Sequence, residues 1–246
     1  MSKNERLQSE KEFHNETFSK KTRSATGKYY KSANLGKEKY QKTLFADVNG
    51  KRVLEYGCGP GSAAFDLARK GAKVTAIDIA DVAIEMAEKQ ANEEGLDIDF
   101  FVMDAENLNF EDDTFDMICG SGILHHLDLR ASYNEIRRTL KKEGKAVFFE
   151  PLGHNPVINL YRNLTPSMRT DDEHPLLMED IKMAESYFQK TTTHYFNLTA
   201  TAAAFVPFLS EPLHKLDAVL FRNITFLKKY AWIVVLEFHS PRKVET

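Results

Sequence analysis

Short apolar runs alternate with amphipathic segments between residues 50 and 150. The short runs are rich in β-branched and large apolar residues, as buried strands are, whereas the longer segments repeat apolar residues at helical spacing. Strands that alternate with helices favour a parallel sheet with right-handed crossover connections. The strands predicted here are residues 52–56, 73–77, 98–102, 115–118 and 146–149.

Helical segments separate these strands, and a glycine follows each helix, as is common at helix C-termini. In the longest segment the apolar stripe consists of Val82, Ile84, Met86 and Ala87, which we expect to face the sheet. The predicted helices are residues 62–70, 81–94 and 129–142.

Beyond Pro151 the pattern is less regular, because Pro, Asn, Arg and His interrupt it. The remaining predicted elements are a structured loop or lid at 151–175, a helix at 177–188, strands at 191–198 and 230–238, and a mostly helical insert at 200–229. We expect one domain over residues 1–246, made of an N-terminal arm (1–45), a core (46–150) and the segments after it (151–246).

Composition is that of an ordinary globular protein. Of 246 residues, 42% are hydrophobic and 28% charged, and the net charge of −3 gives no general attraction to nucleic-acid phosphates. The N-terminus lacks the apolar region of a secretory signal, and the two cysteines, Cys58 and Cys119, make no disulfide framework. We expect a soluble cytoplasmic protein, monomeric or homodimeric, without stable membrane insertion.

A glycine-rich turn follows the first predicted strand. Gly57, Gly59 and Gly61 precede a helix, so the backbone can approach a ligand closely near free N–H groups. A dinucleotide-binding turn has the spacing G-x-G-x-x-G, which would place its third glycine where this chain has Ser62. This disfavours a dehydrogenase.

An acidic residue ends the second predicted strand. Asp78 follows Gly57 by twenty-one residues, a position that suits a carboxylate binding two ribose hydroxyls. Glu55, next to the turn, favours a cationic ligand part over phosphate. A nucleoside with an amino-acid tail fits both observations, and S-adenosylmethionine is the common one.

The chain resembles the class I S-adenosylmethionine-dependent methyltransferases, and within them the small-molecule branch of the ubiquinone and menaquinone biosynthesis methyltransferases. Four segments carry the resemblance in the usual order: VLEYGCGPG at 53–61, AIDIA at 76–80, FVMDAENLNF at 101–110 and FDMICGSGILHHL at 115–127. The resemblance implies an α/β, Rossmann-like seven-stranded sheet with helices on both faces and an antiparallel last strand. To this the chain adds an N-terminal helical arm and the helical insert, which departs from the family's short hairpin.

The resemblance also implies an S-adenosylmethionine site, in which Asp104 faces the adenine amino group and Ala105 lies beside the ring. The expected cofactor-binding residues are Glu55, Gly57, Cys58, Gly59, Gly61, Asp78, Ile79, Asp104, Ala105, Gly120 and, from the arm, Tyr30.

The end of the fourth strand bears on the methyl acceptor. Enzymes that methylate nucleic-acid amino groups have a (D/N/S)-P-P-(Y/F) motif there, whereas this chain has Cys-Gly-Ser-Gly at residues 119–122. We therefore expect a small-molecule acceptor with an oxygen, nitrogen or carbon nucleophile. The alternatives are a non-catalytic cofactor-binding scaffold and an RNA methyltransferase.

Two adjacent histidines follow the fourth strand and are the candidate catalytic residues. Histidine can accept a proton from an attacking hydroxyl or amine near neutral pH. Since neighbouring side chains point in different directions, only one of His125 and His126 is expected to act, and His126 is favoured. The alternative is that one caps the following helix and the other packs.

Acceptor-binding residues are expected after the fifth strand, because ligands bind at the carboxyl ends of strands in such sheets. His154, Asp172 and His174 have ligand chemistry but no recognised metal spacing, so no metal is expected. The apolar residues of 200–229 form either a packed helical hairpin or a lining for a hydrophobic, lipid-like acceptor. The candidate acceptor residues are Glu150, His154, Tyr161, Arg169 and His174.

The N-terminal arm carries aromatic residues, including Tyr29, Tyr30 and Tyr40, that a solvated tail would not need. We predict that residues 29–40 close the site together with residues 151–175. The alternative is that these aromatics anchor a helix to the sheet.

Overall fold

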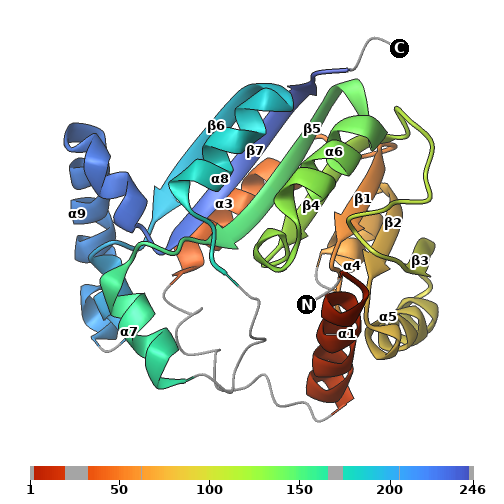
Figure 1. The fold of residues 1–246 in the computed structure, drawn as a ribbon, viewed down its shortest axis with the longest axis horizontal. Coiled ribbons are helices and arrows are strands. Elements are labelled where there is room, and N and C mark those ends of the chain that lie inside the picture. The colour runs from red at the N-terminus through yellow and green to blue at the C-terminus, as the bar shows by residue number, and fades with distance from the viewer. Residues whose placement is uncertain (1–2, 20–32, 62, 166–173, 205, 244–246) are drawn as a thin grey trace.

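The computed structural model describes residues 3–19, 33–61, 63–165, 174–204 and 206–243. Its centre is a seven-stranded sheet of order β3-β2-β1-β4-β5-β7-β6, in which β7 runs antiparallel to both neighbours and the other pairs are parallel (Figure 1). This confirms the predicted fold class. The strands are β1 (Arg52–Tyr56), β2 (Lys73–Asp78), β3 (Ile98–Val102), β4 (Phe115–Ser121), β5 (Leu140–Pro151), β6 (Phe188–Phe196) and β7 (Ile233–Pro241).

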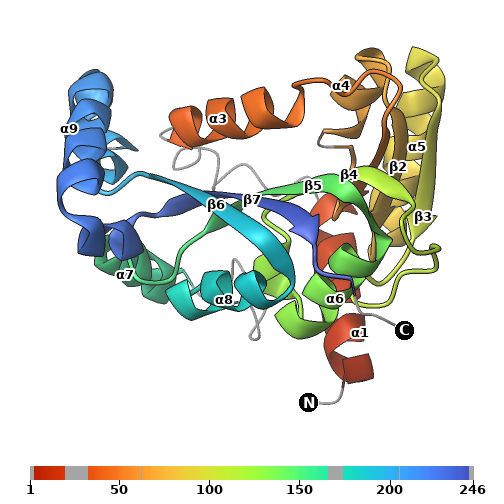
Figure 2. The same ribbon diagram turned by 90° about the horizontal axis from the view of Figure 1, so that it is seen from above.

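Helices cover both faces of the sheet (Figure 2). On one face lie α3 (Asn34–Leu44), α4 (Ala64–Arg69) and α5 (Asp81–Glu94), and on the other α6 (Leu129–Thr139) and α8 (Met178–Met183). Within the described residues, no helix is both long and apolar enough to span a bilayer. The other helices are α1 (Lys3–Ser19), α7 (Pro156–Leu164) and α9 (Ser210–Asn223).

Each face of the sheet has its own hydrophobic core. Because side chains alternate along a strand, Val53 of β1 packs with Leu67 of α4, while Leu54 packs in the other core with Tyr133 and Ile136 of α6. Burial on both faces explains why the central strands are continuous apolar runs.

Long-range pairing moves several boundaries. The helix predicted at 129–142 ends at Thr139, because Leu140 pairs with Phe115 and begins β5. The helix expected at 177–188 is shorter, since Phe188 already pairs with Pro241.

Some stripe and loop predictions also need correction. In α5 the buried residues are Ala83, Ile84, Ala87 and Ala91, whereas Met86 is exposed. The buried face of this helix is therefore rotated by part of a turn from the predicted apolar stripe. The segment expected to be a loop or lid contains α7, whose first turn is capped by Asn155.

The insert between β6 and β7 is helical, as predicted, and lies with α7 beside the β6 and β7 side of the sheet (Figure 1). Asp217 of α9 is buried and accepts the N–H groups of Leu198 and Thr199 at 2.9 and 2.7 Å. The insert packs on the sheet in part, because Phe221 of α9 is buried with its ring centroid 6.3 Å from that of Tyr195 of β6. Much of the remaining apolar surface on α7 and the insert stays exposed. The exposed residues are Val157, Leu160, Leu164, Phe208, Leu209, Leu216, Val219, Ile224 and Phe226.

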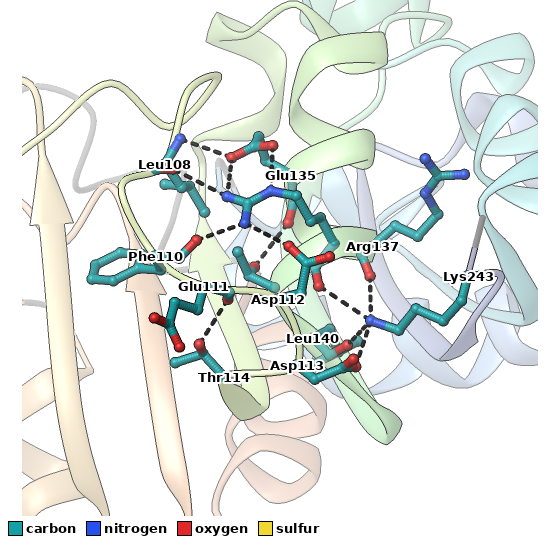
Figure 3. Close-up of polar contacts among 12 residues, drawn as sticks. Leu108, Phe110, Glu111, Asp112, Asp113, Thr114, Glu135, Arg137, Leu140 and Lys243 are labelled. Carbon is teal, nitrogen blue, oxygen red and sulfur yellow. Dashed lines mark hydrogen bonds and ion pairs between the residues drawn. The ribbon is translucent and has the colours of Figure 1, made fainter. Parts of the chain in front are cut away.

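A polar network closes the amino ends of the central strands (Figure 3). The guanidinium of Arg138 donates to Glu135, to Asp112 and to the carbonyl of Leu108. Lys243 donates to the carbonyl of Leu140 at 2.6 Å, so the end of the described chain is joined to the start of β5. We call these residues the amino-end network.

Candidate active site

The glycine turn between β1 and α4 has a left-handed backbone. Gly57 and Gly59 have φ angles of 60° and 53°, a region that side chains disfavour. A Cβ atom at Gly57 would lie 2.7 Å from the side chain of Ile123, and one at Gly59 would lie 3.6 Å from the ring of Phe18. Larger residues would therefore disturb the turn and fill the space beside it.

Asp78, at the end of β2, is tied to this turn. One carboxylate oxygen accepts the N–H of Gly59 and the other that of Ala80, each at 2.8 Å. An ionised carboxylate has about four acceptor positions. Asp78 can therefore hold the turn and still accept hydroxyl groups from a ligand.

A pocket opens at the carboxyl ends of these strands, where ligands bind in open α/β sheets. Asp104 and Ala105, which follow β3, line it across from the glycine turn. The predicted cofactor residues brought together around this pocket are Gly57, Gly59, Asp78, Ile79, Asp104 and Ala105.

The other predicted cofactor residues that the structure describes lie outside the lining. Glu55 is fully buried, and its carboxylate accepts the N–H groups of Ala63 and Ala64 at 2.9 and 2.8 Å, which stabilises the start of α4. We had expected it near a cationic ligand part, whereas the structure places it beneath the turn.

Packing explains the remaining glycines. A Cβ at Gly61 would lie 2.2 Å from the ring of Phe65, and one at Gly120 would lie 2.7 Å from Ile123. Both positions support the shape of the site without lining it. Tyr30 lies outside the described residues.

The cysteines are also structural. Cys58 and Cys119 are buried, and burial, followed by the nearby Glu55 carboxylate, raises the pKa of both thiols. Neither lines the pocket, so neither is placed to act as a nucleophile on a bound ligand.

Helix α1, part of the arm predicted at residues 1–45, covers the pocket. Its lining residues, which share one side of the helix, are Arg6, Leu7, Glu10, His14 and Phe18. Their spacing of three and four residues was the available signal. In Figure 1 α1 lies beyond the carboxyl ends of β1 and β4.

Ion pairs attach α1 to the loops that follow the strands. Lys3 contacts Asp104 at 3.0 Å, and the guanidinium of Arg6 binds Glu106 and donates to the carbonyl of His126 at 2.9 Å. These contacts join residues about a hundred positions apart in the chain, beyond the reach of local patterns.

The described part of the segment expected to cover the site, residues 33–40, leads into a helix on another part of the sheet. Tyr40 of α3 is buried, with its ring centroid 6.1 Å from that of Phe149, in the core on the opposite face from α6. It therefore anchors α3 to the sheet, and the expectation that it closes the site is wrong. Residues 29–32 of the predicted segment lie outside the described residues.

The two candidate catalytic histidines have different surroundings. His126 lines the pocket, with its Nδ1 atom 3.3 Å from Glu10. His125 is buried outside the lining, with its Nδ1 atom 2.7 Å from Glu150. Glu150 also accepts the N–H groups of Ile123 and Leu124, so it organises the turn that presents His126.

None of the predicted acceptor residues that the structure describes lines this pocket. Glu150 is fully buried, and the Nε2 atom of His154 accepts the N–H of Met178 at 3.3 Å. Tyr161 lies on α7, and the backbone N–H of His174 donates to the carbonyl of His125 at 3.3 Å. Arg169 and Asp172 lie outside the described residues.

Comparisons with known proteins agree with this geometry. Residues 53–144 match the family model of a methyltransferase domain. The ubiquinone biosynthesis O-methyltransferase of Nitrosococcus oceani is 38% identical over 117 residues, which are 47% of this chain and 50% of that protein. The chain thus matches about half the length of the curated relatives.

Solved structures share the fold over a longer span. Haemonchus contortus phosphoethanolamine N-methyltransferase 2, in complex with phosphomonomethylethanolamine and S-adenosylhomocysteine, matches 85% of this chain and 53% of its own, with a TM-score of 0.62 and 17% identity. Geranyl diphosphate C-methyltransferase from Streptomyces coelicolor matches 82% of this chain and 77% of its own, with a TM-score of 0.60 and 13% identity. Residues 53–144 thus match a methyltransferase domain, and the chain shares the fold of these methyltransferase structures.

Proposed function

We propose that this protein transfers a methyl group from S-adenosylmethionine to a small-molecule acceptor. The observation that carries the proposal is the convergence of Gly57, Gly59, Asp78, Asp104 and His126 on one pocket at the carboxyl ends of the strands. A scaffold without a ligand would have no physical need for two left-handed glycines beside a fixed carboxylate.

The residues of the pocket fit this cofactor. Asp78 would accept the ribose hydroxyls, and Asp104 and Ala105 would contact the adenine, while Gly57 and Gly59 leave space for the methionine portion. The bound cofactor supplies a methyl group on a positively charged sulfur, which is already activated for transfer. The protein then needs mainly to orient the acceptor and to exclude water.

We assign the exclusion of water to α1. Phe18 and Leu7 supply apolar surface at the pocket, and Arg6 holds the helix against Glu106 and His126. Closure by this helix would shield the reacting groups from water, and its release would admit ligands. The proposed lid is therefore α1, whereas Tyr40 packs in the core on the opposite face from α6.

We assign the promotion of proton removal from the acceptor to His126. Of the two adjacent histidines, it is the one that lines the pocket, and Glu10 contacts its Nδ1 atom. His125 is a positioning residue in this proposal, because its bond to Glu150 supports the turn. The predicted residues after β5 remain candidates for contacts with the distal part of the acceptor.

We further propose a hydrophobic, lipid-like acceptor with a hydroxyl nucleophile. Two observations support this class: the curated relatives are O-methyltransferases of ubiquinone biosynthesis, and exposed apolar side chains such as Leu160 and Phe226 gather on α7 and the insert. The location in the cytoplasm and the monomeric or homodimeric state belong to the same proposal.

Calorimetry with S-adenosylmethionine and S-adenosylhomocysteine tests the cofactor. Binding of both by the full chain, with weaker binding after Asp78→Ala and unchanged binding after Asp99→Ala, is expected. Asp99 is an exposed carboxylate of β3 and serves as the matched control. Absence of binding would refute the methyltransferase proposal.

A second experiment identifies the acceptor. The protein is incubated with methyl-labelled S-adenosylmethionine and an extract of its own cells, and the labelled product is identified. Label in a small apolar molecule supports the acceptor class, whereas label in RNA contradicts it.

A further inference from the structure

Three side chains with metal-ligand chemistry meet at the wall of the pocket. Glu10 and His14 lie four residues apart on α1, and therefore on one side of the helix. His126 comes from the short helix η2 (Leu124–His126), more than a hundred residues further along the chain. One ligand atom from each of the three residues lies within 4.8 Å of the other two.

The distances are close to those around a small cation. Glu10 lies 3.1 Å from the Nε2 atom of His14 and 3.3 Å from the Nδ1 atom of His126, through different carboxylate oxygens. A tetrahedral ion with ligand bonds of about 2.0–2.1 Å holds its ligand atoms about 3.4 Å apart. Both Glu10 pairs are already near this separation, and the two imidazoles offer ligand atoms within 4.8 Å of each other.

The ligand types indicate which ion would bind. Two imidazoles and one carboxylate suit zinc and other divalent first-row transition metals, whereas magnesium and calcium prefer oxygen ligands. Three protein ligands leave at least one coordination position for water or a substrate, as in catalytic zinc sites. All three residues line the pocket, so that position can be reached from it.

The surroundings tolerate a positive charge. Glu10 is buried, and the neighbouring cations, Arg6 and Lys3, are both paired with Glu106. Arg6 also donates to the backbone carbonyl of His126, which fixes the segment that carries this ligand. Outer contacts of this kind orient the ligands of metal sites.

We propose that Glu10, His14 and His126 bind a divalent first-row transition metal ion in the pocket. The ion is held between the helix that covers the pocket and the turn after β4, so metal binding stabilises the closed position of α1. A use in catalysis rests on the proposed function: the open coordination position suits the acceptor hydroxyl, whose pKa a bound ion lowers. In that form His126 promotes proton removal by holding the ion rather than by accepting the proton itself.

Titration with Co²⁺, followed by visible absorption, tests the site on the full chain after treatment with a chelator. We expect one equivalent to bind, with the strong absorption of a four- or five-coordinate ion. His14→Ala and Glu10→Gln each lose a direct ligand and should bind at least about 100-fold more weakly, since even outer contacts contribute about 10–100-fold. His214→Ala, on α9, is the matched control and should bind as the parent does.

Two results would overturn the site: no Co²⁺ binding by the parent, or equal binding by the parent and Glu10→Gln. Glu10→Gln keeps the size of the side chain and decides the question if His14→Ala does not fold. Circular dichroism checks that each variant is folded.

Calorimetry with S-adenosylhomocysteine, in the presence and absence of a chelator, separates this inference from the proposed function. Binding of S-adenosylhomocysteine without binding of Co²⁺ would refute the metal site alone. Binding of Co²⁺ to the three residues without binding of S-adenosylhomocysteine would support the metal site and refute the methyltransferase proposal.

Discussion

The two ends of the sheet use similar charged residues in different ways. At the amino ends of the strands, Arg138 donates to Glu135 and to the carbonyls of Leu108 and Phe110, and Glu135 accepts the N–H of Leu108. The amino-end network therefore stabilises loops (Figure 3). At the carboxyl ends, Asp78, Asp104 and Glu10 line a pocket. Both sets have partners within the protein, but only the second also lines a cavity that a ligand could enter.

The two ends of the sheet also differ in the sequence separation of the residues that contact each other there. Arg138 and Glu135 lie three residues apart on α6, a spacing that favours side-chain contact within a helix. The pocket is covered by α1, which reaches it through contacts such as Arg6 to Glu106. Changes at one end should therefore affect stability, and changes at the other should affect binding.

The largest effect is expected at the glycine turn. Gly57→Val should abolish binding of S-adenosylhomocysteine, because the residue has a φ of 60° and its Cβ would lie 2.7 Å from Ile123. Gly50→Val is the control, since Gly50 has a similar φ of 74° with no neighbour within 4 Å of its Cβ. Calorimetry should show normal binding for the control, and equal loss in both variants would contradict the assignment.

Removal of residues 1–28 should lower turnover strongly while the melting temperature changes little. The deletion removes α1, which closes the pocket in our proposal but has only Glu10 and Phe18 buried. Steady-state kinetics and thermal unfolding measure the two effects. Unchanged kinetics with an unchanged melting temperature would show that α1 is no lid.

The amino-end network should behave in the opposite way. Arg138→Ala leaves the largely buried Glu135 without its cation and should lower the free energy of unfolding by about 2–3 kcal/mol. Affinity for S-adenosylhomocysteine should stay the same. Urea unfolding and calorimetry test this pair of effects, and a large loss of affinity would mean that the two ends are coupled.

Asp78→Ala is expected to have the smallest effect of the four. Unpaired ribose hydroxyls should reduce the binding free energy of S-adenosylhomocysteine by about 1–3 kcal/mol. Loss of the bond from the N–H of Gly59 adds to this, because the turn becomes less well held. Calorimetry beside Asp99→Ala gives the comparison, and equal affinity in parent and Asp78→Ala would remove Asp78 from the ribose site.

Much of the site could be predicted because its signals are local. Gly57, Gly59 and Asp78 occupy the ends of adjacent strands, and the topology of a parallel sheet brings such ends together. Glu55 and Gly61 carry the same sequence signal, yet they serve the start of α4 and the packing of Phe65. A motif does not show which of its residues face the ligand.

The sequence by itself determined the central strands, the long helix at 81–94 and the left-handed turn, since each depends on periodicity or on conformational preferences over a few residues. Tertiary structure decided the position of α1, the separation of His126 from His125 and the meeting of Glu10 and His14 with His126. These depend on contacts between segments far apart in the sequence, 25 residues for His125 and Glu150 and 116 for His126 and Glu10. Their free energies come from burial and charge pairing in the folded chain and leave no periodic pattern in the sequence.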